Sequence, residues 1–432
     1  MDGKTIVARL KKLRDVETIR EVKTLTAAMF PGPHCPLMGA AMAVRGIRDG
    51  VILVLGTEEC AYYTKDMTIH SGEFGGLAGR CVSVVLDKGD VTFGFREKAE
   101  AAFGELMAEY GPRAVFLTTT CVVEIIGEDV DALAARMTEK WGIPVMAVHT
   151  EHFKCENHIP GLARTISACF DIMESRPPDG SVNVLGQRMG DFSKTELSRV
   201  LGEAGARVGL RLPSGCSVEE IKGAAAAKVN VVVNEIALPL ARRMEAEFGI
   251  PWVFFDRFVS PENIMAAYER LFAALALPLP DQLRGLYAAA RKARDGAARA
   301  LSGVKYIYGN TPLRTFEFNR LLVELGMIPA LIQTSSLEPE DRADIAAILE
   351  KSDPYVTKTA NIAPLQFVYD ELQPDVYLGH EFAARLRKKG IAIAHTDRAS
   401  GMLGFEVTGF VLGALAAAAR EAKEYRKEVF AS

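Results

Sequence analysis

Short, continuous apolar runs alternate with longer amphipathic segments along the whole chain. Strands of a parallel sheet are buried on both faces and give such runs, and the amphipathic segments predict helices that cover the sheet. The pattern therefore predicts an α/β fold built on parallel sheets. The expected strands cover residues 51–56, 81–86, 114–118, 144–148, 182–185, 206–210, 229–233, 252–255, 305–308, 328–332, 355–357, 376–378 and 391–394. The clearest expected helices cover residues 36–48, 96–110, 128–141 and 279–301.

Two interruptions divide this alternation into three stretches. Arg176-Pro-Pro-Asp-Gly180 breaks the pattern before a new strand, and Ser302-Gly303 ends a long helical stretch before another. A chain of 432 residues is also longer than one hydrophobic core usually supports. We therefore expect three α/β domains, over residues 1–176, 177–301 and 302–432.

Composition and charge narrow the choice of partners and compartment. The net charge of -4 gives no reason to expect nucleic acid or an anionic membrane as a partner. The first ten residues lack the apolar core of a signal peptide, and no apolar run is long enough to span a bilayer. We expect a cytoplasmic protein. Seven cysteines, an odd number, argue against a disulfide framework and favour metal binding or buried thiols.

Three cysteines stand out because each lies where a helix is expected to begin. Cys60 and Cys121 directly follow apolar strands, and Cys35 precedes the helix expected over 36–48. The carboxyl ends of parallel strands meet at one edge of a sheet, so these thiols can converge, and helix N-termini stabilise thiolates. Three thiolates can hold an iron–sulfur cluster but leave one iron without a protein ligand. That ligand must come from another chain, a non-cysteine residue or solvent.

The segment 149–158 concentrates polar chemistry after the strand 144–148. It holds three of the seven histidines and one cysteine. It is either a solvated loop or a cavity wall at the same sheet edge as Cys60 and Cys121. In the second interpretation Cys155 could contact a cluster, and nearby side chains could donate protons to a reduced substrate. These candidate donors, with one from a similar turn in the last third, are His152, Lys154, His158 and His395.

Two glycine-rich segments need separate interpretations. Gly75 and Gly76 lie in the segment 72–79, which is either a plain turn or bare backbone whose amides approach cluster sulfides. The segment 186–195 resembles a phosphate loop, but its second glycine is too far from Lys194 to cradle phosphates. We interpret it as an ordinary turn from strand to helix. We expect neither ATP nor NAD on this chain.

The sequences around the three cysteines resemble the nitrogenase component 1 family. The shared elements are Cys-Pro-Leu-Met-Gly-Ala from residue 35, Val-Leu-Gly-Thr-Glu-Glu-Cys-Ala-Tyr-Tyr from residue 54, and Thr-Thr-Thr-Cys-Val-Val-Glu-Ile-Ile-Gly-Glu-Asp from residue 118. The segment Glu245–Trp252 is also similar to the family. This family includes nitrogenase subunits, cofactor-assembly scaffolds, light-independent protochlorophyllide reductases and methylthio-alkane reductases.

The resemblance implies three Rossmann-like domains with clusters and substrate in the clefts between them. It implies that Cys35, Cys60 and Cys121 hold a 4Fe-4S cluster, or a larger P-cluster-type cluster shared with a partner subunit. It also implies a dimer or heterotetramer with an identical or paralogous component 1 subunit. A separate ATP-dependent reductase of the Fe-protein type would supply low-potential electrons.

Two segments depart from the catalytic nitrogenase subunits, which hold their large cofactor with one cysteine and one histidine. The corresponding stretches, Val231–Ala237 and Ser400–Phe410, contain neither residue. Reduction of dinitrogen at such a cofactor is therefore not expected. Two functions stay open. The chain is either the component 1 subunit of an ATP-dependent reductase of a small organic substrate, or a scaffold for assembly of a complex metal cofactor.

Overall fold

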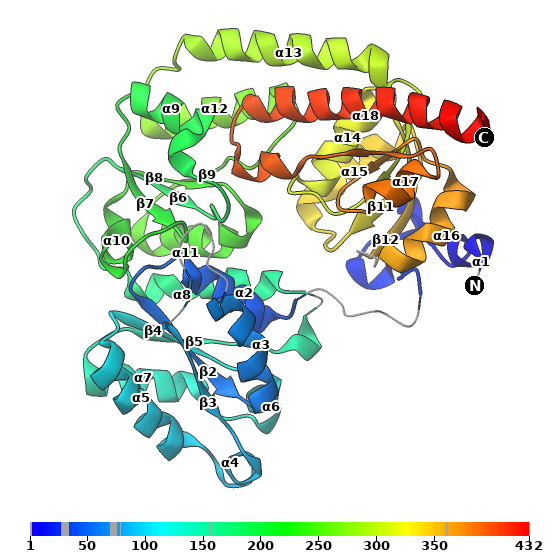
Figure 1. Ribbon diagram of the computed structural model, residues 1–432. Helices are drawn as coiled ribbons and strands as arrows, with labels where there is room; N and C mark the ends of the chain where they lie inside the picture. The colour runs from blue at the N-terminus through cyan, green and yellow to red at the C-terminus, as the bar shows by residue number, and fades with distance from the viewer. Residues whose placement is uncertain are drawn as a thin grey trace.

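The computed structural model describes residues 2–26, 34–69, 76–77, 79–155, 157–358 and 362–431. Three sheets, two of them fully parallel and one parallel except for a short edge strand, account for most of this part of the chain together with the helices that cover them (Figure 1). The α/β prediction is confirmed. In the described part of the chain no helix is both long and apolar enough to cross a membrane.

The first sheet carries the cysteines, and its strand order is β3-β2-β4-β5. Its strands are β2 (Gly50–Gly56), β3 (Cys81–Val85), β4 (Ala114–Thr118) and β5 (Val145–Val148). Every residue of the two central strands is buried, which explains their continuous apolar sequences. Its helices are α2 (Pro36–Arg45), α3 (Glu58–Ile69), α4 (Lys88–Phe93), α5 (Arg96–Tyr110), α6 (Cys121–Ile126), α7 (Val130–Trp141) and α8 (Ile159–Ala168).

The second sheet is also fully parallel, with the order β7-β6-β8-β9. Its strands are β6 (Val182–Leu185), β7 (Val208–Leu212), β8 (Val229–Val232) and β9 (Trp252–Phe254). Its helices are α9 (Glu196–Glu203), α10 (Val218–Lys222), α11 (Leu238–Phe248) and α12 (Pro261–Leu275). Together α8 and α11 join the first two units, because their apolar faces share one core.

The third sheet has the order β1-β12-β11-β10-β13-β14. Its parallel strands are β10 (Lys305–Tyr308), β11 (Ile328–Thr334), β12 (Tyr355–Lys358), β13 (Val376–Leu378) and β14 (Ala392–Ala394). Its helices are α14 (Thr315–Glu324), α15 (Arg342–Leu349), α16 (Ile362–Leu372) and α17 (Ala383–Arg387). Two long helices, α13 (Gln282–Leu301) and α18 (Glu406–Ala431), lie side by side above the second and third sheets (Figure 1).

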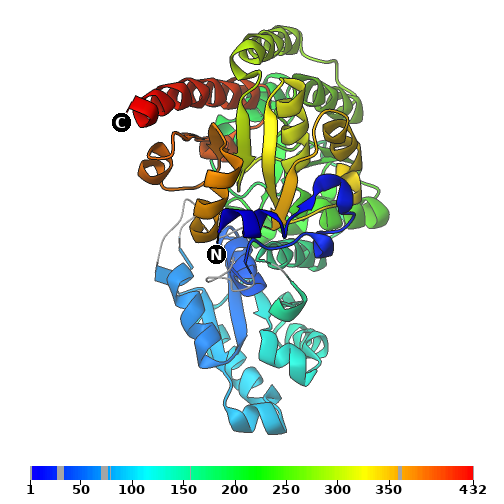
Figure 2. The ribbon, with the colours of Figure 1, turned by 90° about the vertical axis from the view of Figure 1, so that its right-hand side faces the viewer.

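The N-terminal segment does not join the first sheet. The short strand β1 (Lys11–Lys12) pairs antiparallel with β12, and α1 (Gly3–Val7) packs on α16. Figure 2 shows this segment beside the third sheet. The expected first domain of residues 1–176 is wrong in this respect, because its first residues bury their apolar side chains against the third sheet. The boundaries after residues 176 and 301 stay predictions.

Candidate functional site

The three cysteines lie where the sequence predicts, at the beginnings of helices around the carboxyl edge of the first sheet. Cys35 is the N-cap of α2, Cys60 is in the first turn of α3, and Cys121 is the first residue of α6. All three side chains are half-buried and none forms a disulfide. The thiols therefore come from three separate segments and retain surface for a ligand.

These three thiols lie close enough to influence one another electrostatically. Burial raises the pKa of Cys60, and the neighbouring Cys35 and Cys121 raise it further, whereas the hydroxyls of Thr57 and Thr120 lower it. Three facing thiolates repel one another unless a cation lies between them. This donor set fits an iron–sulfur cluster, whose charge would stabilise the thiolates.

Single-ion binding does not explain the arrangement. Within the described ranges, no three His, Cys, Asp or Glu side chains are grouped as ligands of one metal ion. Cysteines that bind different irons of one cluster are spread more widely than the ligands of one ion, so the two observations agree. The roles of Cys35, Cys60 and Cys121 as cluster ligands stay predictions.

Direct backbone contact between α2 and α8 fixes the position of Cys35. A Cβ atom at Gly39 would lie 2.0 Å from the carbonyl oxygen of His158, and one at Gly161 would lie 1.8 Å from that of Pro36. Only glycine permits such close approach of two helices. The thiol of Cys35 is thereby placed beside the start of α8.

Arg80 provides a second restraint on the elements that carry the cysteines. Its guanidinium donates to the carbonyl oxygens of Ile47 (2.7 Å), Gly50 (2.9 Å), Gly76 (3.2 Å) and Arg45 (3.3 Å). These carbonyls belong to the end of α2, the start of β2 and the turn before β3. One side chain therefore ties the helix that follows Cys35 to the strand that leads to Cys60.

Cys155 lies next to this group of thiols. Burial raises its pKa, Arg164 opposes that shift, and Cys121 is close enough to add to it. Cys155 is half-buried, whereas His152 and Lys154, on the preceding 3-10 turn, are exposed. The placement allows Cys155 to contact a cluster held by the other three cysteines, and this role stays a prediction.

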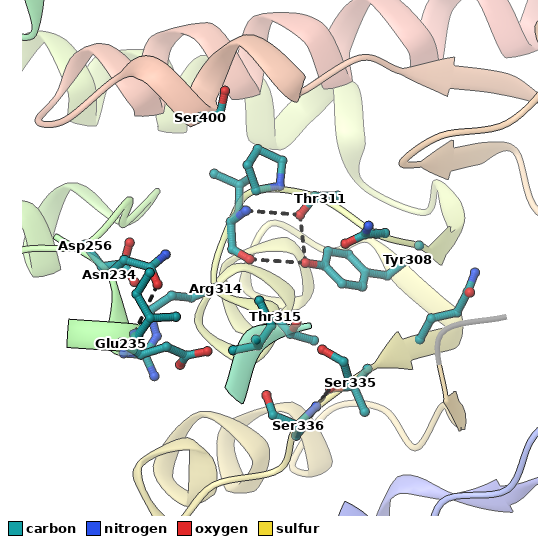
Figure 3. A pocket seen from close by; sticks show the side chains of 18 of the residues that line it. Asn234, Glu235, Asp256, Tyr308, Thr311, Arg314, Thr315, Ser335, Ser336 and Ser400 are labelled. Atoms are coloured by element: carbon teal, nitrogen blue, oxygen red, sulfur yellow. Dashed lines mark hydrogen bonds between the residues drawn. The ribbon is translucent and has the colours of Figure 1, made fainter. Parts of the chain in front are cut away.

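A cavity of about 500 Å³, which we call the inner cavity, lies in the cleft where loops from the second and third sheets meet the start of α8. Figure 3 shows side chains from these separate loops facing one another. The lining residues that carry polar side chains include His158, Arg188, Asn234, Glu235, Asp256, Tyr308, Asn310, Thr311, Arg314, Thr315, Gln333, Thr334, Ser335, Ser336, Asp341, His380, Asp397 and Ser400.

Most charged groups of the inner cavity have a partner. Arg314 pairs with Asp341 at 3.3 Å, and His380 Nε2 lies 3.1 Å from Asp397. Arg188 and Glu235 are exceptions, since neither side chain forms a hydrogen bond or ion pair with any residue that the structure describes, although Asp256 and Glu235 are close enough to attract Arg188 electrostatically. Burial and the nearby Arg257 lower the pKa of Arg188. This guanidinium is available to a negatively charged ligand.

Two further cavity residues have displaced pKa values. Glu235 is open to the cavity, but the surrounding protein excludes bulk water and raises its pKa to about 7, and Asp256 adds to the shift. Burial lowers the pKa of His158 to about 4, helped by Arg188 and His34. At neutral pH the imidazole is therefore uncharged, and its Nδ1 is buried without a partner.

The predicted polar residues have different positions. His158 lines the inner cavity, whereas His395 is exposed and does not line that cavity. Gly76 accepts a hydrogen bond from Arg80, and Gly75 lies outside the described residues. Proton donation by His152, Lys154, His158 or His395, and cofactor contacts by Gly75 or Gly76, stay predictions.

Sequence reasoning missed the charged residues that dominate the inner cavity. Arg188 lies in the turn 186–195, and Glu235 lies in the segment noted only because it lacks a cysteine. The available signal was their position after β6 and β8, at the edge where parallel sheets place ligands.

Comparison with known proteins defines the family. The model for nitrogenase component 1 type oxidoreductases matches residues 35–418. The chain therefore belongs to the nitrogenase component 1 type oxidoreductase family, and the resemblance of its cysteine motifs is confirmed. Members of this family carry iron–sulfur clusters.

Several curated relatives are nitrogenase proteins. NifE from Clostridium pasteurianum, a nitrogenase iron-molybdenum cofactor biosynthesis protein, is 32% identical over 51% of this chain and 49% of its own length. NifE from a Nostoc species is 26% identical over 80% of this chain and 73% of its own length. The nitrogenase molybdenum-iron protein alpha chain of Clostridium pasteurianum is 26% identical over 57% of this chain and 48% of its own length. The chain thus spans about half the length of its Clostridium relatives.

The fold also matches a solved structure. Nitrogenase Cp1 at pH 6.5 superposes with a TM-score of 0.75 over 92% of this chain and 95% of the other, at 16% sequence identity. At this identity the match concerns the fold alone. It agrees with three sheets arranged around a cleft.

Proposed function

We propose that this chain is a scaffold subunit that holds a complex nitrogenase-type metal cofactor before its transfer to a target enzyme. The observation that carries the proposal is the extended similarity to cofactor biosynthesis proteins, which reaches 80% of this chain in the Nostoc relative. In this proposal the metal cofactor is cargo, bound in the inner cavity and later released.

The donors of the inner cavity support a releasable cargo. The segments that lack the cysteine and histidine of nitrogenase contribute Asn234, Glu235 and Ser400 to its wall. Their oxygen donors are hard ligands and bind iron of a sulfur-rich cluster more weakly than a thiolate does. A cargo held in this way would dissociate more readily than one fixed by a cysteine.

Arg188 would provide the main electrostatic contact with a negatively charged cargo. Its guanidinium lies in the cavity wall without a partner among the described residues. Of the two carboxylates that attract Arg188, those of Asp256 and Glu235, the carboxylate of Asp256 is already 3.4 Å from Arg257. A guanidinium that is partly shielded from bulk water binds an anion more strongly than one at an exposed surface does.

The cysteine group would hold a separate, resident cluster. Cys35, Cys60 and Cys121 are the proposed ligands, and Cys155 is the candidate for a further contact. A bound iron–sulfur cluster supplies one-electron transfer. The chain's own contribution is to hold three thiols at fixed positions and to place the Thr57 and Thr120 hydroxyls beside one of them.

A transfer assay tests the proposal. The chain is isolated without oxygen from a host that makes a nitrogenase cofactor, and it is mixed with nitrogenase component 1 that lacks its cofactor. We expect activity to appear in the recipient, and Arg188→Ala to supply much less than Arg299→Ala, an exposed control in α13. If the wild-type chain activates no recipient although the recipient responds to isolated cofactor, the scaffold proposal is wrong.

The second candidate function is the reductase of a small organic substrate. The absence of the cysteine and histidine that hold the nitrogenase cofactor also favours this second function, because a cavity without those ligands can accept an organic molecule. In that case the chain would transfer no metal cofactor. Substrate reduction would require an ATP-dependent reductase of the Fe-protein type with MgATP, and NADPH as the sole reductant would not support it.

A further inference from the structure

A second cavity, of about 600 Å³, borders the inner cavity. We call it the outer chamber. Six residues line both cavities and form the wall between them: Ile159, Glu235, Ile236, Arg314, Ser335 and Ser336. The outer chamber is bounded mainly by α8, α11 and β9, and it differs from the inner cavity in the character of its side chains.

Apolar atoms make up most of the surface of the chamber wall, although half of its lining residues carry polar or charged side chains. Trp252 and Phe254 are two residues apart on β9 and therefore face the same side of the strand. The other apolar lining residues are Ile159, Pro160, Ala163, Ile236, Leu238 and Pro239. The two rings are only half-buried, so aromatic surface is open to the chamber. The inner cavity, by contrast, is lined mainly by polar groups.

The aromatic rings are held in place without a ligand. The indole N–H of Trp252 donates to Glu245 Oε2 at 3.0 Å. Phe254 packs edge to face on Phe258, with 5.9 Å between ring centroids, and the Arg314 guanidinium lies 5.0 Å from the centroid of Phe254. Side chains that are already ordered lose little entropy when a ligand binds. The chamber is therefore pre-organised for a flat molecule.

The cationic residues at the chamber rim are already paired. Lys154 lies 3.6 Å from Glu151, Arg242 lies 3.5 Å from Glu340, and Arg314 lies 3.3 Å from Asp341. A strongly anionic ligand would have to break one of these pairs. The walls thus favour a ligand without net charge, and the volume lies within the range typical of small-molecule sites, about 300–1,000 Å³.

From these observations we infer that the outer chamber is a binding site for a small, planar, largely apolar and uncharged organic molecule. The inference goes beyond the scaffold function and does not depend on it. Cys155 also lines the chamber and lies beside Cys121. A molecule bound there is a neighbour of the cysteine group.

The test uses the neutral naphthalene ketone 6-propionyl-2-dimethylaminonaphthalene with the full chain. Trp141 and Trp252 are the only tryptophans, so Trp141→Phe leaves Trp252 as the sole indole reporter. We expect saturable binding at one site by equilibrium dialysis at pH 7, with quenching of Trp252 emission.

Two variants change the outer chamber: one adds a bulky side chain and the other adds a negative charge. Ala163→Phe should weaken binding about tenfold or more, whereas Ala101→Phe, at an exposed position of α5, should not. Pro239→Glu adds a carboxylate to the chamber at the start of α11, where a negative charge favours the helix, so it should fold and still bind poorly. Absence of saturable binding, or wild-type affinity in both Ala163→Phe and Pro239→Glu, would overturn the inference.

Discussion

Glu196 and Glu406 cap each other's helices. Helix α9 begins at Glu196 and α18 begins at Glu406. The Glu196 carboxylate accepts the backbone N–H of Phe405 (2.8 Å) and of Glu406 (3.1 Å), and Glu406 Oε1 accepts the N–H of Glu196 (3.1 Å). Tyr268 also donates its hydroxyl to Glu196 at 3.0 Å. This reciprocal contact joins a helix of the second sheet to one that packs on the third, on either side of the cleft.

Removal of the Glu196 carboxylate should destabilise the fold. In Glu196→Ala one buried and one half-buried backbone donor and the buried Tyr268 hydroxyl lose their acceptor, and we expect the free energy of unfolding to fall by about 3 kcal/mol. Urea denaturation at pH 7 measures this effect. Glu269→Ala, an exposed position on α12, should change the unfolding free energy much less. Equal stability of the two variants would contradict the structural role.

The same carboxylate makes stability depend on pH. Burial and the charge of Glu406 raise the pKa of Glu196 above its ordinary value, although the hydrogen bonds oppose this shift. The folded state then holds the proton more tightly than the unfolded state does. Its stabilising contribution is complete below the ordinary glutamate pKa and is lost as the pH rises through the raised value. In Glu196→Gln this part of the pH dependence should disappear from a series of urea denaturations.

Cys121 should be required for bound iron. Cys121 is the first residue of α6, and its thiol is close enough to affect the pKa of Cys60. Cys121→Ala therefore removes one of the three proposed ligands. We expect the protein to lose most of the iron and sulfide that belong to the resident cluster. Cys81→Ala and Cys169→Ala, at two cysteines outside the proposed group, should keep their iron. Full retention of iron in Cys121→Ala would remove the basis of the assignment.

Arg80 should matter for iron content although its guanidinium forms no hydrogen bond with any of the three proposed ligands. Replacement by Met leaves four carbonyl oxygens without this donor and frees the end of α2 from the start of β2. We expect a loss of at least about 2 kcal/mol in unfolding free energy and a lower iron content. The EPR signal of the remaining cluster should also shift, which a general loss of stability would not produce. Arg113→Met, at a neighbouring loop, serves as the control, and an unchanged signal and iron content in Arg80→Met would contradict this role.

The surface around the cysteine group should bind another subunit. Ile125 on α6 is 71% exposed and Phe153 is 55% exposed, which is unusual for large apolar residues beside a candidate site. We expect Ile125→Glu to weaken self-association or association with a paralogous subunit in sedimentation measurements. Phe382→Glu, at an exposed apolar residue near the third sheet, should leave association unchanged. A wild-type chain that stays monomeric, alone and with its paralogue, while retaining its cluster would rule this surface out.

The sequence predicted the strands and the cysteine group because both depend on local patterns. The wholly buried strands β2 and β4 have continuous apolar sequences, and the cysteines follow strands or begin helices. It did not predict that Lys11 and Lys12 pair with β12, since two polar residues carry no strand pattern. That pairing depends on contacts between residues more than 300 positions apart.

The inner cavity could not be predicted for a similar reason. Gly186 and Gly190 have positive φ angles, and glycines at these positions indicate a tight turn. The local sequence does not indicate that Arg188, between them, lines a cavity together with loops of the third sheet. The raised pKa of Glu235 arises first from burial, and then from Asp256 and from charged residues of the third unit. These properties depend on contacts between units that are distant in the sequence. Only the three-dimensional structure shows that these groups lie together.

Metal analysis of two variants tests the central claim most directly. The triple variant Cys35→Ala, Cys60→Ala, Cys121→Ala and the single variant Arg188→Ala are isolated without oxygen from a host that makes a nitrogenase cofactor. The account predicts that the triple variant loses the resident cluster but still activates a cofactor-deficient nitrogenase. Arg188→Ala should keep the cluster and lose most of this activation. If both variants lose iron and activation together, the chain has one metal site and not two, and the account is wrong.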